Sequence, residues 1–236
     1  MQLTLSLTPQ DSINFDNFVE GGNKVAIQAL QTSLAKMGEQ FIYLYGDLGA
    51  GRTHLLQACC HWIGQRGGRA AYLPFGEDYH FSPSLLDNLE QLDLVCIDDI
   101  DRIAGQREWE EALLYTYDRL KAHQTRFFVS APILPTELSI HLSDLKSRFS
   151  WGWVFHIKPL HDEQKLEVIK ARALKRGIHL SEEVSHYLIR HYSRDFRELF
   201  HILNRLDQAS LRAKRRLTIP FVKTVLENEA LCKNRG

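Results

Sequence analysis

The sequence has few cysteines, few prolines and no excess of charge of either sign. Four cysteines occur in 236 residues, without a C-x-x-C or Cys/His metal-site spacing, so we expect reduced structural thiols. The seven prolines, 14 glycines and 44% apolar residues exclude a disordered or fibrous chain. Lys and Arg together number 29, as do Asp and Glu, so no net charge recruits nucleic acid. Any DNA contact is therefore local or indirect.

Long hydrophobic runs are also missing from the sequence. Stretches such as Phe41–Tyr45 fall far short of the roughly 20 apolar residues that cross a bilayer. The start, Met1–Thr4, has no basic segment followed by an apolar core, so we expect a cytoplasmic protein with no membrane contact. No G-x-S-x-G or H-E-x-x-H motif occurs, which disfavours a conventional hydrolase.

What the sequence does have is an alternation of strand-like and helix-like segments over its first two thirds. Runs rich in β-branched and aromatic residues cover Phe41–Tyr45, Ala70–Phe75, Leu94–Ile97, Phe127–Ser130 and Trp153–Ile157. Helical spacing covers 53–66, 82–91, 107–123 and 135–149. Strands that alternate with helices predict crossover units, and thus an α/β fold whose five-stranded parallel sheet is buried on both faces.

The strand signal ends at Pro159, and only helical patterns follow. They cover 162–176, 181–192 and 195–214, with a short fourth segment at 219–228. We therefore predict an α/β domain over residues 11–160 and a small all-α domain over 161–236. Residues 1–10 stand apart as an extended tail, because Leu3, Leu5 and Leu7 alternate with polar residues before Pro9.

A glycine-rich loop follows the first predicted strand and opens a helix. It reads Gly46-Asp47-Leu48-Gly49-Ala50-Gly51-Arg52-Thr53. Such a loop curls its backbone N–H groups around phosphate oxygens, and Thr53 would offer a hydroxyl to Mg²⁺. Arg52 stands where the standard loop has Lys, and its wider guanidinium prefers bidentate contacts. We expect phosphate binding to persist while hydrolysis suffers.

A pair of carboxylates ends the third predicted strand. Asp98 and Asp99 follow the apolar run Leu94–Ile97, as in a magnesium-holding strand. An isolated Asp-Asp pair is more often part of a turn. Its place downstream of a phosphate loop favours the magnesium site instead, with Asp98 holding the ion and Asp99 orienting a water.

Together these motifs resemble the DnaA initiator family of AAA+ nucleotide-binding proteins. Ile13–Gly21 is similar to that family's opening box, Thr53–Leu56 to its loop-to-helix continuation, Leu145–Gly152 to its arginine-finger box and Arg194–Leu199 to its second sensor. The resemblance covers about residues 11 to 228 and implies an AAA+ module, a helical lid and bound ADP or ATP with Mg²⁺. The nucleotide-binding residues it implies are Phe18, Val19, Gly46, Asp47, Gly49, Ala50, Gly51, Arg52, Thr53, His54 and Arg197.

The resemblance also gives two arginines a role. Arg148 would be an arginine finger that acts on a neighbour's nucleotide; the alternative is a salt-bridged arginine at a helix end. Arg197 would reach over the chain's own phosphates; the alternative is an exposed arginine beside Glu198. The family's acidic first sensor is missing, because the chain reads Ser130-Ala131-Pro132 there. We therefore expect weak or no intrinsic ATPase activity, and no enzyme in its own right.

The two ends of the chain differ from the initiators. Those proteins continue into a DNA-reading helix-turn-helix, whereas this sequence ends at Gly236, so we expect no reading of an origin sequence. At the other end, Gln2–Leu7 resembles the peptide that binds the bacterial sliding clamp, with Gln2, Leu3, Leu5 and Leu7 as its contacts. The alternation alone favours a plain edge strand, whereas the position at the N-terminus before Pro9 favours the clamp-binding peptide.

The resemblance therefore implies a DnaA-related negative regulator of replication initiation. Its partners would be DnaA and the polymerase III sliding clamp (beta subunit), with DNA met only through the clamp, which would associate it with the nucleoid. Two alternatives stay open: a self-contained AAA+ ATPase of the loader or motor type, and a DNA- or membrane-tethered recruiter of initiator that acts without hydrolysis. Self-association of the chain is a further open point.

Overall fold

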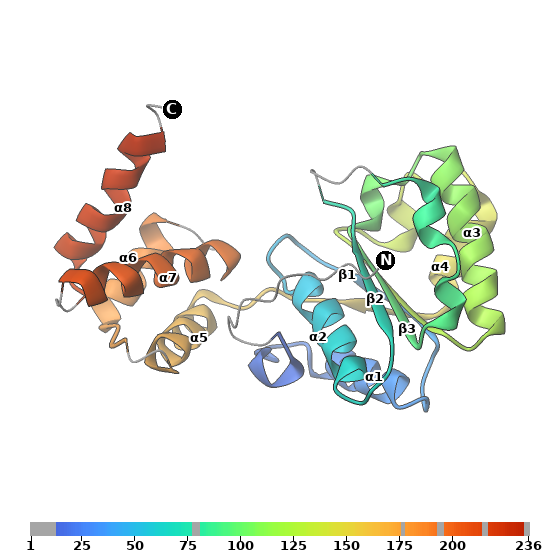
Figure 1. Ribbon diagram of the computed structural model, residues 1–236, viewed down its shortest axis with the longest axis horizontal. Helices are drawn as coiled ribbons and strands as arrows, with labels where there is room; N and C mark the ends of the chain where they lie inside the picture. Colours follow the sequence, from blue (N-terminus) through green and yellow to red (C-terminus); the bar gives the residue numbers. More distant parts are fainter. Residues whose placement is uncertain (1–12, 77–80, 176–177, 193–195, 214–216, 234–236) are drawn as a thin grey trace. The chain divides into compact units, whose positions relative to one another are not determined.

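The computed structural model describes residues 13–76, 81–175, 178–192, 196–213 and 217–233. The predicted tail of residues 1–10 lies outside these ranges. The chain divides into two compact units between Pro159 and Leu160. Figure 1 shows the strands in the first unit and a group of helices in the second.

A five-stranded parallel sheet forms the centre of the first unit. Its strands are β1 (Phe41–Tyr45), β2 (Ala70–Pro74), β3 (Leu94–Asp98), β4 (Arg126–Ala131) and β5 (Trp153–His156). They lie in the order β2-β3-β4-β1-β5, and each neighbouring pair is parallel. The predicted sheet is thus confirmed. Because the strands are parallel, the end of β1, which leads into the glycine-rich loop, and the end of β3, which carries the two carboxylates, meet at one edge.

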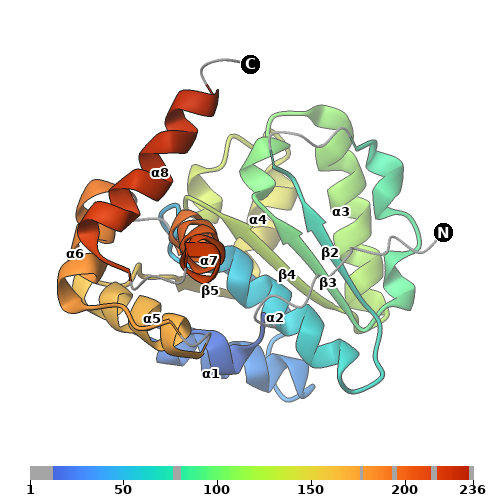
Figure 2. The ribbon, with the colours of Figure 1, turned by 60° about the vertical axis from the view of Figure 1, so that its left-hand side comes forward.

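Helices cover both faces of this sheet. The side chains of β1 point alternately to the two faces, and each face has its own hydrophobic core. Ile42 and Leu44 pack with α1 (Lys24–Leu34) and α2 (Arg52–Gly64), whereas Phe41 and Tyr43 pack with the second helical layer. That layer consists of α3 (Arg107–Ala122) and α4 (Ser143–Trp151). Figure 2 shows α2 and α3 on opposite sides of the strands. Every residue of β3 and β4 is buried, as expected for a sheet covered on both faces.

Two of the predicted helical segments in the first unit are wrong in detail. Over 82–91 the chain forms two 3₁₀ turns, η2 (Pro83–Leu86) and η3 (Leu89–Gln91), because Asn88 has a left-handed backbone with φ of 61°. Over 135–149 it forms the short η5 (Pro135–Glu137), and α4 begins only at Ser143. The 3₁₀ turns η1 (Phe15–Asn17) and η4 (Ile100–Arg102) complete this unit.

The second unit is a group of four helices around its own core. They are α5 (Asp162–Lys175), α6 (Glu182–His191), α7 (Phe196–Ala213) and α8 (Ile219–Lys233). Ile169, Leu188, Leu203 and Val222 are fully buried, one from each helix. The Ser181 hydroxyl caps α6 by accepting the Val184 N–H at 3.3 Å. Within the described parts of both units, no helix has the length and apolarity that a bilayer span requires.

Candidate functional site

The loop between β1 and α2 depends on glycine where the chain passes other atoms closely. A Cβ on Gly46 would lie 2.3 Å from the Ile157 carbonyl oxygen. Gly51 has φ of 104°, and a Cβ there would lie 2.7 Å from the Phe18 ring. The turn into the N-terminus of α2 is therefore available only to glycine, and a helix N-terminus behind such a turn favours an anion.

Residues of the predicted opening box meet this loop. The ring centroid of Phe18 lies 5.4 Å from that of His54, in the first turns of α2. The His54 Nε2 lies 2.9 Å from the Asn14 carbonyl oxygen, which ties the segment before α1 to the helix. The structure thus brings Phe18, Gly51 and His54 together, while Val19 beside them is 37% exposed.

Arg52, the first residue of α2, has a buried side chain that is 8% exposed. One of its terminal nitrogens, Nη2, lies 3.3 Å from Asp99 Oδ1. The other, Nη1, is buried and has no hydrogen-bond partner in the described part of the molecule. A buried N–H donor without a partner costs about 1–3 kcal/mol, so this nitrogen fits a ligand that brings an acceptor.

Both carboxylates at the end of β3 have partners within the protein. Asp98 accepts a hydrogen bond from the Tyr72 hydroxyl at 2.7 Å and another from the Ser130 hydroxyl. The Asp99 N–H donates to the same Ser130 oxygen at 3.2 Å. Burial, the Asp98 charge and the hydrogen bond raise the pKa of Tyr72 well above its ordinary value. Burial and the neighbouring Asp98 also raise the pKa of Asp99, although Arg52 opposes this shift.

The residues at this site fit a phosphate group better than they fit a magnesium ion. The glycine cradle and the unpartnered Arg52 nitrogen fit a phosphate group. The expected magnesium residues fit less well, because Asp98 is 3% exposed with both oxygens bonded and Asp99 is paired with Arg52. Thr53 is half-buried, and the described residues contain no group of three or more His, Cys, Asp or Glu suited to a metal. Mg²⁺ commonly takes one or two protein oxygens beside waters and substrate phosphates, so a bound ion would share these carboxylates with their present partners.

Arg148 lies far from this edge, on α4. Its Nε and Nη2 donate to the two carboxylate oxygens of Asp118 on α3, each at 3.0 Å. Its guanidinium carbon lies 6.0 Å from the Tyr117 ring centroid and 5.9 Å from that of Trp151. The Arg148 side chain is 19% exposed and that of Asp118 is 52% exposed, so the pair lies at the surface. The fork-to-fork contact fixes the orientation of the guanidinium.

The packing of α4 places Arg148 at the start of the strands rather than at their carboxyl ends. Its neighbour Phe149 is fully buried and stacks on Phe41, the first residue of β1, with ring centroids 5.6 Å apart. Gly46 begins the glycine-rich loop at the other end of that strand. At about 3.3 Å per residue, Phe41 and Gly46 are roughly 16 Å apart. Arg148 is therefore far from its own chain's loop.

Glu110 on α3 is a site residue that the sequence reasoning missed. Its buried carboxylate accepts backbone N–H groups from Gly105 at 2.8 Å, His141 at 3.0 Å and Leu142 at 2.9 Å. Burial alone would raise its pKa, but these donors outweigh burial and hold the pKa of Glu110 below its ordinary value. The last two donors precede α4, so Glu110 anchors the helix that carries Arg148. Its position three residues before Leu113, on the buried side of α3, was the available signal.

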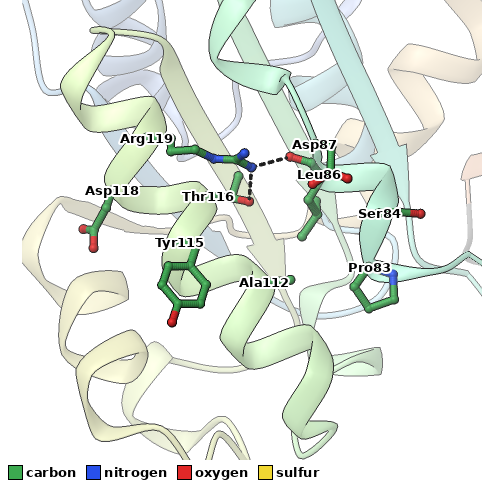
Figure 3. A pocket seen from close by; sticks show the side chains of 9 residues that line it. All are labelled: Pro83, Ser84, Leu86, Asp87, Ala112, Tyr115, Thr116, Asp118 and Arg119. Atoms are coloured by element: carbon green, nitrogen blue, oxygen red, sulfur yellow. Dashed lines mark hydrogen bonds between the residues drawn. The ribbon is translucent and has the colours of Figure 1, made fainter.

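A pocket of about 560 Å³ lies between α3 and η2, beside Asp118 (Figure 3). Arg119 closes one side by donating to the Leu86 carbonyl oxygen at 2.9 Å and to the Thr116 hydroxyl at 3.3 Å. Tyr115, on the same helix, is 69% exposed. The pocket borders the carboxylate that holds Arg148, not the glycine-rich loop.

Some predicted site residues lie outside the described part of the structure. These are the tail residues Gln2, Leu3, Leu5 and Leu7. Arg197 belongs to α7, but its side chain also lies outside the described residues. Their predicted roles remain predictions.

The fold and the glycine-rich loop define the class of protein as a P-loop nucleotide-binding module of the AAA+ type. The family model for the bacterial DnaA ATPase domain matches residues 10–156, and that for "Hda, lid domain" matches residues 162–226. The chain therefore belongs to the DnaA family, as an Hda-like member.

Solved structures agree with this fold at low identity. Domain III of the Thermotoga maritima replication initiation protein DnaA has a TM-score of 0.77 at 22% identity, and the match covers 94% of this chain and 98% of that one. AMPPCP-bound DnaA from Aquifex aeolicus has a TM-score of 0.68 at 22% identity, with 83% and 65% covered. The Thermotoga maritima RuvB Holliday junction branch migration motor has 0.68 at 19% identity, with 91% and 71% covered.

Proposed function

We propose that this protein is a negative regulator of chromosomal replication initiation. It binds the DNA-loaded sliding clamp through its N-terminal tail and presents Arg148 to ATP bound by the initiator DnaA. Hydrolysis then leaves the initiator in its ADP form. The match to a DnaA ATPase domain followed by an Hda lid supports the regulatory role.

The observation that carries the proposal is the position of Arg148. Phe149 packs at the start of β1, roughly 16 Å from the loop at its other end. This distance supports a role for Arg148 toward a neighbouring molecule rather than toward its own chain's nucleotide. Asp118 holds the guanidinium at the surface, where a partner's phosphates would meet it. A guanidinium at a γ-phosphate stabilises the charge that develops in transfer, worth about 10³–10⁵ in rate when supplied in trans.

The chain's own nucleotide site supports a protein that binds a nucleotide without hydrolysing it, rather than an ATP-driven motor. Arg52 is tied to Asp99, and Ser130 bonds Asp98 where the family has an acidic sensor. Pro132, two residues further, has no N–H with which to position a water. We infer that a bound nucleotide, ADP by resemblance, is kept rather than turned over.

The experiment that tests the proposal is phosphate release by purified, ATP-bound DnaA. It is measured with and without this protein and DNA-loaded clamp, and with each component alone. We expect release to rise only when all three are present. Hydrolysis by this protein alone, unaffected by the clamp, would instead favour the self-contained ATPase.

The tail is tested separately by clamp capture on immobilised, clamp-loaded DNA. Replacing Gln2 and Leu3 by Ala should abolish capture, because the directional amide and one apolar anchor are lost together. A matched control replaces Thr4 and Ser6, which the alternation places on the opposite side. Capture that survives the first pair of substitutions would refute the clamp-binding role. Direct, salt-dependent retention on DNA without clamp would favour the DNA-tethered recruiter.

A further inference from the structure

The pairing of Arg52 with Asp99 leaves a buried positive charge at the site where a divalent cation is expected. The Arg52 side chain is 92% buried, given its 8% exposure, and holds Asp99 Oδ1 at 3.3 Å. A guanidinium does not lose its proton in proteins, so this charge is permanent. A magnesium ion would have to approach a fixed cation of the same sign.

The two carboxylates of the site, Asp98 and Asp99, already have partners within the protein. Asp99 adopts a left-handed backbone with φ of 56° and ψ of 51°, a conformation that Asp enters more readily than most residues other than glycine. Its N–H is held by Ser130, and its carboxylate by Arg52. Asp98 is engaged by Tyr72 and Ser130. Direct coordination of a cation by Asp98 or by Asp99 Oδ1 would compete with one of these contacts.

Within the described residues, the other terminal nitrogen of Arg52 lacks a hydrogen-bond acceptor. This nitrogen, Nη1, is buried and lies on the first residue of the helix that follows the Gly46–Gly51 loop. A phosphate oxygen in that loop would supply the acceptor that this nitrogen lacks. The same side chain would then join the carboxylate to the phosphate, which is the role that a magnesium ion has in the standard site.

We propose that this site binds a nucleoside diphosphate without a divalent cation, with Arg52 bridging Asp99 and the terminal phosphate. This inference rests on the nucleotide-holding part of the proposed function.

Equilibrium binding of fluorescent ADP to the full chain, with magnesium and with EDTA, tests the inference directly. We expect the Kd of the wild-type protein to change by less than about twofold on chelation. Arg52→Lys should make binding magnesium-dependent by about tenfold or more, because a single ammonium cannot bridge Asp99 and a phosphate as the guanidinium fork does. Arg66→Lys, beyond the far end of α2, is the matched control and should behave as wild type.

The possible outcomes distinguish failure of the cation-free binding from failure of the nucleotide-holding role and of the regulatory role. A loss of about tenfold or more in wild-type affinity on chelation overturns the inference, even if Arg52→Lys fails to fold. No binding in either buffer overturns it together with the nucleotide-holding role. Stimulation of DnaA hydrolysis is a separate readout, which decides the regulatory role whichever way the cation result falls. The thermal midpoint with ADP provides a second check, since it should rise equally in both buffers.

Discussion

Replacing Glu110 by Gln should destabilise the first unit far more than its position on a helix suggests. The two carboxylate oxygens accept three backbone N–H groups at 2.8–3.0 Å, and the side chain is 1% exposed. Gln offers one oxygen and one NH₂, so at least one buried donor faces another donor. That clash and the lost charge assistance cost about 2–4 kcal/mol together.

This loss translates into a thermal shift that calorimetry or circular dichroism can measure. For a unit of this size each kcal/mol moves the midpoint by about 2–4 °C, so we expect a fall of roughly 4–16 °C. Glu111→Gln is the control, because Glu111 is 47% exposed and pairs with the exposed Arg107. Its effect should stay within about 0.5 kcal/mol. Equal midpoints for the two variants would refute the anchoring role of Glu110.

The pH dependence of stability offers an independent check on the same residue. The folded-state pKa of Glu110 is lowered, so its contribution is present above the unfolded-state pKa, about 4.3, and is lost as pH falls through the folded value. The stability gap between wild type and Glu110→Gln should therefore be full at neutral pH and shrink below about pH 4. A gap that stays constant from neutral pH to strong acid would contradict the assignment.

Three further substitutions probe other parts of the site. Phe149→Ala should cost about 3–5 kcal/mol in urea unfolding, because it empties the stacked contact with Phe41; a loss below about 1 kcal/mol would contradict the packing. Gly46→Ala should weaken ADP binding about tenfold or more, since its Cβ would meet a carbonyl oxygen at 2.3 Å, whereas Gly64→Ala, with open space around it, should not. Asp118→Asn should raise the half-maximal concentration for stimulating DnaA about two- to fivefold, because Arg148 loses the carboxylate that orients it; a lower concentration would contradict this.

The sheet was predictable because its signals are local. The run Phe41–Tyr45 is apolar on both faces and precedes a glycine-rich loop, and the observed strand has the same bounds. The segment 82–91 was not predictable from apolar spacing, because one left-handed residue, Asn88, decides where the helical turns stop. Helix α4 begins at Ser143 because the preceding N–H groups bind Glu110, a partner more than 30 residues away.

The site residues also divide into those with a local sequence signal and those whose partners are distant in the sequence. The glycine-rich loop and the carboxylates of β3 follow from adjacent residues, so the sequence locates them. Their partners come from other strands: Tyr72 from β2 and Ser130 from β4. The register pairs Tyr72 with Cys96, two residues before Asp98, so a correct strand alignment would have indicated the contact. Asp118, which holds Arg148, has no local signal, because helix packing alone brings α3 and α4 together.

The most direct test of the account is phosphate release by ATP-bound DnaA in the presence of DNA-loaded clamp and the Arg148→Ala protein. We predict that stimulation is lost, by up to the 10³–10⁵ typical of a finger supplied in trans, while clamp capture and the thermal midpoint stay near wild type. Arg107→Ala, an exposed arginine on α3, is the control and should stimulate fully. Stimulation by Arg148→Ala equal to that of the wild type would contradict the central claim.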